Sequence, residues 1–170
     1  MSSIERQNAD LTPRPLARSQ PMFHRVLQAD PHAVRRTLKD LRTRFAPQIS
    51  PDTMGRLELV LAEVMNNVAE HADLAQLPKG GSRSIHLCVV MHDNGLSCAI
   101  TDDGGQLPAD CLLPRSLPAM DPLDLPEGGF GWFLIQGLTQ SLCYYREDQR
   151  NCLAFMVPYQ QSQFSGPISG

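Results

Sequence analysis

The stretch "LAEVMNNVAEHA" at residues 61–72 is the most informative part of the sequence, because it places polar residues beside the apolar face of a predicted helix. Ser50-Pro51 supplies an N-cap and a first-turn proline, so the helix is predicted to run from there to about His71. At about 100° per residue, the apolar side chains form one core stripe made of Leu57, Val60, Leu61, Val64 and Val68. Glu63, Asn67 and His71 recur every fourth residue and drift toward that stripe. Asn67 and His71 are therefore expected at the edge of the buried face.

A polar group in that position needs a partner. Burying an amide or an imidazole without one costs roughly 1–3 kcal/mol. Taken alone, the helix leaves two explanations open. Asn67 and His71 could bond to neighbouring backbone in an ordinary core, or they could face a bound ligand.

Two glycine-rich stretches lie downstream of this helix. In "TDDGG" (101–105), Asp102 ends a predicted strand before two glycines, a pattern that fits a simple turn or a carboxylate beside a ligand ring. In "GGFGWFLI" (128–135), glycines open a predicted helix, where free N–H groups and the helix dipole favour phosphate. Neither stretch is a Walker motif or a dinucleotide fingerprint, and each alone is weak support for a site.

The order of the remaining elements predicts the architecture. A strand at 22–29 precedes a helix that starts at Asp30-Pro31 and ends before Pro47. Further along come a strand at 84–92, a turn at 93–95, a return strand at 96–101, a long proline-rich stretch from Gly104 to Gly128, a short helix at 131–140 and a last hairpin turning around Asp148 to Asn151. This order predicts an α/β (α+β) fold. We expect a two-layer sandwich with one mixed, mostly antiparallel sheet and helices on one face.

Composition narrows the class of protein. The 170 residues suit one domain, predicted at 21–159, between disordered tails at 1–20 and 160–170. A net charge of −3 without a general basic field argues against nucleic-acid binding, and no apolar run reaches the ~18 residues of a membrane helix. Five cysteines without metal-ligand spacing indicate reduced thiols and a cytoplasmic location.

Taken together and in this order, the motifs resemble those of the GHKL ATPases, the superfamily of gyrase, Hsp90, histidine kinases and MutL, which share the Bergerat ATP-binding fold. The most similar branch is that of the bacterial anti-sigma-factor serine/threonine kinases. "LAEVMNNVAEHA" resembles the N box of this family, "ITDDGGQLP" its G1 box, "EGGFGWFLIQGL" its G2 box and "NCLAFMVP" its closing strand. The resemblance covers about residues 22–158.

The resemblance implies a role for each matching residue. Glu63 corresponds to the general base and Asn67 to the Mg²⁺ ligand. Asp102 corresponds to the carboxylate that binds the adenine amino group, and Gly104 to the glycine beside the base. On the phosphate side, the matching residues of the G2 box are Gly129, Phe130 and Gly131. The long loop between the two boxes corresponds to the ATP lid, in which Arg115 could reach the γ-phosphate or simply be solvated.

The resemblance also implies an activity and partners. It implies a kinase that uses ATP and Mg²⁺ to phosphorylate a STAS-type anti-sigma antagonist, and that sequesters a sigma factor or similar regulator, with a homodimer as a further expectation. Gln106 stands where the G1 box usually has a glycine or a proline-containing turn. That departure keeps an alternative open, a catalytically inactive module in which nucleotide gates the binding of a regulatory partner.

Overall fold

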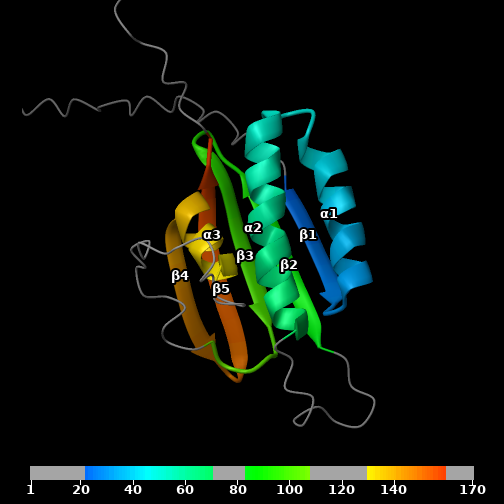
Figure 1. The fold of residues 1–170 in the computed structure, drawn as a ribbon, viewed down its shortest axis with the longest axis vertical. Coiled ribbons are helices and arrows are strands. Elements are labelled where there is room, and N and C mark those ends of the chain that lie inside the picture. Colours follow the sequence, from blue (N-terminus) through cyan, green and yellow to red (C-terminus); the bar gives the residue numbers. More distant parts are fainter. Residues whose placement is uncertain (1–21, 71–82, 108–129, 160–170) are drawn as a thin grey trace, which may run out of the picture.

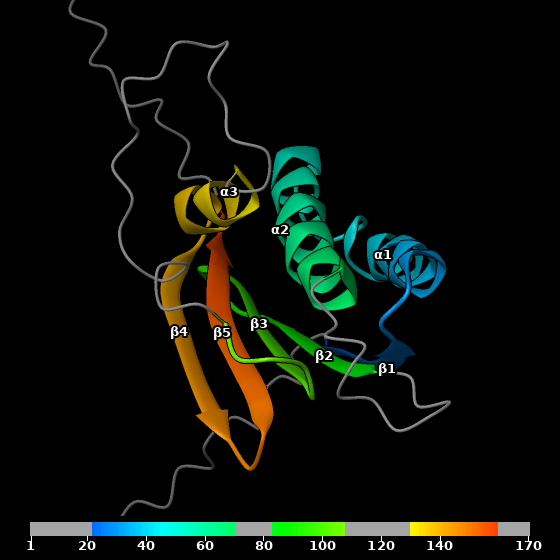
Figure 2. The same cartoon turned by 60° about the horizontal axis from the view of Figure 1, so that its bottom comes forward.

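The computed structural model describes residues 22–70, 83–107 and 130–159, and in these residues five strands form a sheet with three helices packed on one face (Figure 1). The predicted tails, His71, Arg115 and most of the predicted lid lie outside the described residues. The two-layer arrangement is clearest in Figure 2, where all three helices lie on the same side of the sheet. The predicted sandwich is confirmed.

The sheet has the strand order β1-β2-β3-β5-β4, and every neighbouring pair is antiparallel. Its members are β1 (Met22–Gln28), β2 (Ser84–Met91), β3 (Gly95–Asp102), β4 (Gln140–Glu147) and β5 (Arg150–Pro158). The described sheet is thus antiparallel throughout, where a mixed one was expected. One crossover helix between β1 and β2 would have made them parallel, but two successive helices bring the chain back to the end at which β1 finishes.

The helices are α1 (Pro31–Phe45), α2 (Pro51–Glu70) and α3 (Phe130–Leu138). The predicted N-caps are present. Asp30 accepts hydrogen bonds from the backbone N–H groups of His32 and Ala33, each at 2.9 Å, and Ser50 accepts one from Thr53 at 3.1 Å. Asp30-Pro31 and Ser50-Pro51 therefore mark the starts of α1 and α2, as predicted.

The core lies between the helices and the sheet. The predicted stripe of α2 is confirmed, since Leu57, Val60 and Leu61 are fully buried, Val64 is nearly so, and Val68 packs against the core. The same layer contains Leu41, Phe45, Ile85, Leu87, Leu96, Ile100, Ile135 and Val157. This packing fixes the direction in which the polar side of α2 points.

The last hairpin differs from the prediction at two residues, because β5 already begins at Arg150. Asp148 and Gln149 have positive φ angles of 46° and 65°, so these two residues alone make the turn. Asn151 was expected in the turn, but it belongs to β5 and is buried. It faces the core side because Leu153, Phe155 and Val157 alternate behind it.

Candidate functional site

The start of α3 lies against the polar side of α2. A Cβ atom added at Gly131 would lie 2.5 Å from Glu63 Oε2 and 4.0 Å from Asn67 Nδ2. At the first of these distances the Glu63 carboxylate would have to move aside, so glycine at this position leaves the carboxylate where it is. Glu63, Asn67 and Gly131, which are distant in the sequence, are thereby brought together.

Asn67 contains a buried polar atom that needs a partner. Its Nδ2 is shielded from solvent and, within the described residues, makes no hydrogen bond. The Glu63 side chain likewise has no hydrogen-bond partner in that part of the chain. An unsatisfied buried amide is costly, and it favours the second explanation left open by the sequence, a polar group facing a ligand.

Asp102, the last residue of β3, has a buried carboxylate. Only 8% of it is exposed, and its Oδ1 accepts hydrogen bonds from Gly104 N at 2.7 Å and Asn151 Nδ2 at 3.0 Å. Its Oδ2 has no hydrogen-bond partner among the described residues. One oxygen thus holds the carboxylate in place, and the other is left as an acceptor.

Burial raises the pKa of Asp102, since the charged form loses hydration. Hydrogen bonds from Asn151 and Gly104 and the nearby charge of Arg83 partly offset this rise in pKa, whereas the charge of Asp103 adds to it. The carboxylate is therefore kept in an environment that does not favour its charge, which is typical of functional groups.

Asn151 connects Asp102 to the neighbouring strand and loop. Besides its bond to Asp102, it donates to Gly105 O at 2.9 Å and accepts from the Tyr144 hydroxyl and from Arg146, both at 2.8 Å. Arg146 also donates to Gly104 O, and the Tyr144 hydroxyl accepts from Leu107 N at 3.2 Å. This network fixes the backbone of the G1 stretch against β4 and β5.

Comparison with known proteins identifies the arrangement. Residues 27–157 match the family model for the histidine kinase-like ATPase domain. The chain belongs to this family. Membership implies an ATP-binding site, and the Bergerat resemblance of the sequence is confirmed.

Solved structures agree with the fold of the ATPase domain. One match is the chain described as the RsbU and RsbW domains of Rv1364c from Mycobacterium tuberculosis, with a TM-score of 0.54 and 14% sequence identity. The match covers 81% of the present chain but 32% of that one, so the chain spans about a third of its solved relative. No curated protein matches the sequence significantly.

The structure places most of the expected site residues of the ATPase domain. Glu63, Asn67 and Gly131 meet at the α2–α3 junction, and Asp102 and Gly104 meet at the end of β3. Gly129 lies outside the described residues, and Phe130 is described only as the first residue of α3. The roles assigned to these residues remain predictions.

Two residues beside Asp102 were missed by sequence reasoning. The alternation of buried residues in β5, extended back by two positions from Leu153, would have predicted that Asn151 is buried. In the structure, Asn151 lies directly opposite Asp102 in the β3–β5 register. Arg83 is buried, and a Cβ added at Gly104 would lie 2.6 Å from its Nη1. No local pattern marks Arg83, because it precedes β2 and becomes buried only by tertiary packing.

A cavity of about 270 Å³ lies beside the G1 glycines of the ATPase domain. It is lined by Arg83, Asp103, Gly104, Gly105, Arg146, Asp148, Gln149 and Arg150. Glu63 and Asn67 do not line it. This cavity therefore adjoins the predicted base end of the site and not the predicted phosphate end at Gly131.

Proposed function

We propose that the protein is an ATP-dependent serine/threonine kinase that regulates a bacterial partner-switching pathway. The observation that carries the proposal is the meeting of Glu63 and Asn67 at Gly131. A carboxylate and an amide one helical turn apart, next to the start of another helix, suit phosphoryl transfer, which needs positioning and charge neutralisation.

The residues fit ATP and Mg²⁺. Turning the Asn67 amide by 180° would present its oxygen where the unpartnered Nδ2 lies, and an amide oxygen is an acceptable Mg²⁺ ligand. The unused Oδ2 of Asp102 suits the adenine amino group, and the start of α3 suits phosphate. When bound, MgATP would supply the transferable phosphoryl group and the cation that neutralises its charge.

The chain's own residues would then have distinct tasks. Glu63 would accept the proton of the attacking serine or threonine hydroxyl as general base, because its carboxylate has no competing partner among the described residues. Gly131 keeps the start of α3 close enough for backbone N–H groups to face phosphate. Asp102, held by Gly104 and Asn151, orients the base.

The proposed substrate is a STAS-type anti-sigma antagonist, and the proposed second partner is a sigma factor or similar regulator. These partners follow from the resemblance of the N, G1 and G2 boxes to the anti-sigma kinase branch. A similar fold in a chain with an RsbW domain supports them at the level of architecture. The proposal places the protein in the cytoplasm, where free thiols such as those of Cys88, Cys98, Cys143 and Cys152 persist. A homodimer remains part of it.

The decisive experiment is transfer of label from γ-labelled ATP, with Mg²⁺, to a purified STAS-domain protein. Glu63→Ala is expected to bind ATP about as well as the wild type and to lose transfer by at least about a hundredfold, the usual contribution of a general base. Glu70→Ala, an exposed carboxylate on the same helix, is the matched control and should transfer normally. Transfer retained by Glu63→Ala would remove the role assigned to Glu63. Binding without transfer by the wild type would identify the inactive nucleotide-gated module instead.

A further inference from the structure

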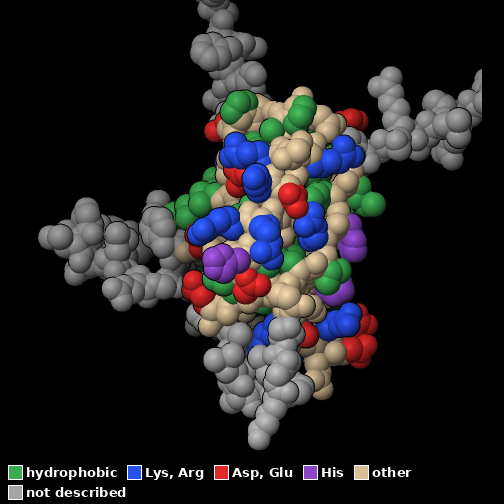
Figure 3. Space-filling model, turned by 90° about the vertical axis from the view of Figure 1, so that its right-hand side faces the viewer, with side chains coloured by type: hydrophobic (Ala, Val, Ile, Leu, Met, Phe, Trp, Pro, Cys, Tyr) green, Lys and Arg blue, Asp and Glu red, His purple; other side chains and the backbone are tan. Residues whose placement is uncertain are grey.

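The segment from β1 through α1 carries a concentrated positive charge. Residues 22–45 contain six of the 15 Lys and Arg residues and only two of the 18 Asp and Glu residues, in a chain of net charge −3. Figure 3 views the side of the molecule on which α1 lies and shows Lys and Arg side chains gathered there. The composition of the whole chain predicted no basic field, because acidic residues elsewhere conceal this one.

Several of these cations lack an acidic partner. Arg25 pairs with Asp40, and Arg42 pairs with Glu58. Arg35, Arg36 and Lys39 are exposed and form no ion pair within the described residues. Three neighbouring cations without an acidic partner create a local positive field, which suits an acidic partner.

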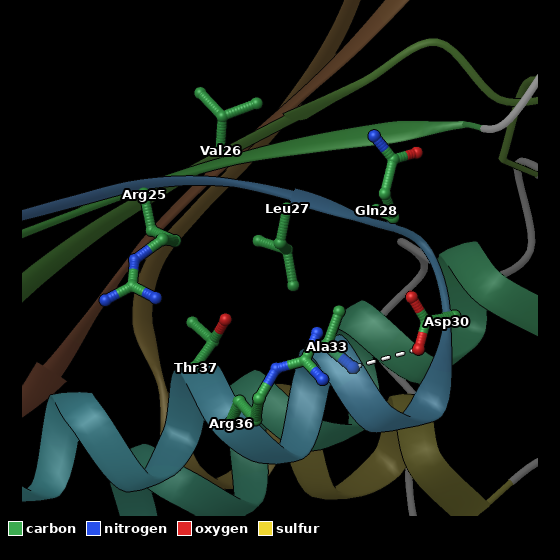
Figure 4. Close-up of a pocket in the computed structure, with 8 residues that line it drawn as sticks. All are labelled: Arg25, Val26, Leu27, Gln28, Asp30, Ala33, Arg36 and Thr37. Carbon is green, nitrogen blue, oxygen red and sulfur yellow. Dashed lines mark hydrogen bonds between the residues drawn. The ribbon is translucent and has the colours of Figure 1, made fainter.

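A pocket of about 270 Å³ lies at this surface, between β1 and α1. Residues 25–28, Asp30, Ala33, Arg36 and Thr37 line it. In Figure 4, Arg25 and Leu27 point from β1 toward α1, whereas Val26 and Gln28 point to the other side of the sheet. Cations therefore line the pocket on the helix side of β1.

β1 is also an edge strand with unpaired backbone groups. Ala29 N donates to Arg83 O, which shows that the backbone N–H and C=O groups of the odd-numbered residues of β1 point toward β2. The backbone groups of the even-numbered residues therefore point away from the sheet, and Met22 O accepts from Arg44 at one end. Among the described residues, the backbone N–H and C=O groups of His24 and Val26 have no partner. They can pair with an added strand.

The two sides of this edge differ in chemistry. Arg25 and Arg36 lie on the helix side, while Met22 and Val26 are 57% and 51% exposed, and Val26 points to the opposite side. Side chains of an added strand alternate between the same two sides. Acidic residues would face the arginines, and apolar residues would lie beside Val26.

We propose that the edge of β1 binds an extended segment of a partner protein in which acidic and apolar residues alternate. The segment adds as a sixth strand next to β1, with its carboxylates toward Arg25 and Arg36. A second copy of this chain is disfavoured at the edge, because two segments of net positive charge would be brought together. The proposal concerns a docking surface remote from Glu63 and does not depend on phosphotransfer.

The test measures binding of a fluorescent decapeptide of alternating valine and glutamate by anisotropy. The control peptide has the same composition arranged as one valine block and one glutamate block. The alternating peptide is expected to bind more tightly, and added salt should weaken its binding. Equal binding of the two peptides would overturn the proposal, since charge alone would then explain it.

Variants of the protein locate the site. Arg36→Gln should weaken binding roughly three- to tenfold, as for partly exposed charge-assisted contacts, while Arg35→Gln, outside the pocket, should have little effect. Asp40→Asn should strengthen binding, because it frees Arg25. Val26→Pro should weaken binding by removing one outward N–H group, with thermal melting to confirm folding.

Other results would contradict the proposed strand-addition site. Equal losses in Arg35→Gln and Arg36→Gln would indicate an unspecific field. Displacement of the peptide by single-stranded oligonucleotide or by anionic vesicles at equal charge would assign the surface to nucleic acid or lipid. A dimer that Val26→Pro dissociates would assign the edge to a second copy.

Discussion

At the scale of single residues, the polar groups at the two ends of the candidate site differ in their hydrogen bonding. Glu63 and Asn67 are left without hydrogen-bond partners in the described structure, whereas Asp102 is held by two bonds to one oxygen. An unpartnered group can respond to a ligand, and a fixed one can discriminate between ligands. We therefore expect catalytic defects from changes at Glu63 and specificity defects from changes at Asp102.

Asp102→Asn tests the specificity role. The amide keeps one oxygen acceptor for Gly104 and Asn151 but replaces the free acceptor with a donor, which would face the donor amine of adenine. ATP binding is expected to weaken at least about tenfold at neutral pH, measured by calorimetry. Unchanged affinity would separate Asp102 from the base.

The same variant has a pH signature. Burial raises the pKa of Asp102, so wild-type ATP affinity should fall as the pH drops through that raised value, and the variant should lack this fall. The sign for stability is opposite. A folded-state pKa above the unfolded one gives stability that is fully present below the unfolded pKa and is lost as the pH rises through the folded pKa. Thermal melts should therefore find Asp102→Asn no less stable than the wild type at neutral pH.

At the scale of elements, two glycines of α3 differ in what an added side chain would meet. A Cβ at Gly131 would overlap the Glu63 carboxylate, whereas one at Gly137, in the same helix, would meet nothing within 4 Å. Gly131→Ala should displace Glu63 and lower phosphotransfer at least about tenfold, because small misplacements cost rate. Gly137→Ala should keep transfer and raise stability by up to about 1 kcal/mol in urea unfolding. Equal activity of the two variants would contradict the close-approach argument.

The sequence predicted individual helices better than it predicted their assembly. The starts of α1 and α2 follow from Asp30-Pro31 and Ser50-Pro51, which are local caps, and the core stripe of α2 follows from its period. The strand order, the all-antiparallel pairing and the burial of Arg83 depend on tertiary packing, which no local pattern encodes. Asn151 was assigned to the turn because a polar residue that follows a turn is typical of a longer turn.

At the scale of the whole molecule, the only tryptophan of the sequence adjoins the predicted nucleotide site. Trp132 follows Gly131, is 8% exposed and belongs to the core. Its emission should change on addition of MgADP, because phosphate at the start of α3 alters the field at its indole. A spectrum unchanged at saturating nucleotide would place the phosphates elsewhere.

The described helices also bear on how the molecule meets its surroundings. None of them is long and apolar enough to span a membrane. The proposed docking edge at β1 and the strand β4 are at opposite ends of the sheet. A partner on the β1 edge would therefore leave the Tyr144 network on β4 and β5 uncovered.

The hydroxyl of Tyr144 has a consequence for how the chain leaves the base end. It bridges Leu107 N and Asn151, and Asn151 in turn holds Asp102. One phenol thus anchors both the carboxylate that would read the nucleobase and the point at which the chain departs toward the G2 box. Leu107 and Asp102 are thus connected through three hydrogen bonds that do not involve α2.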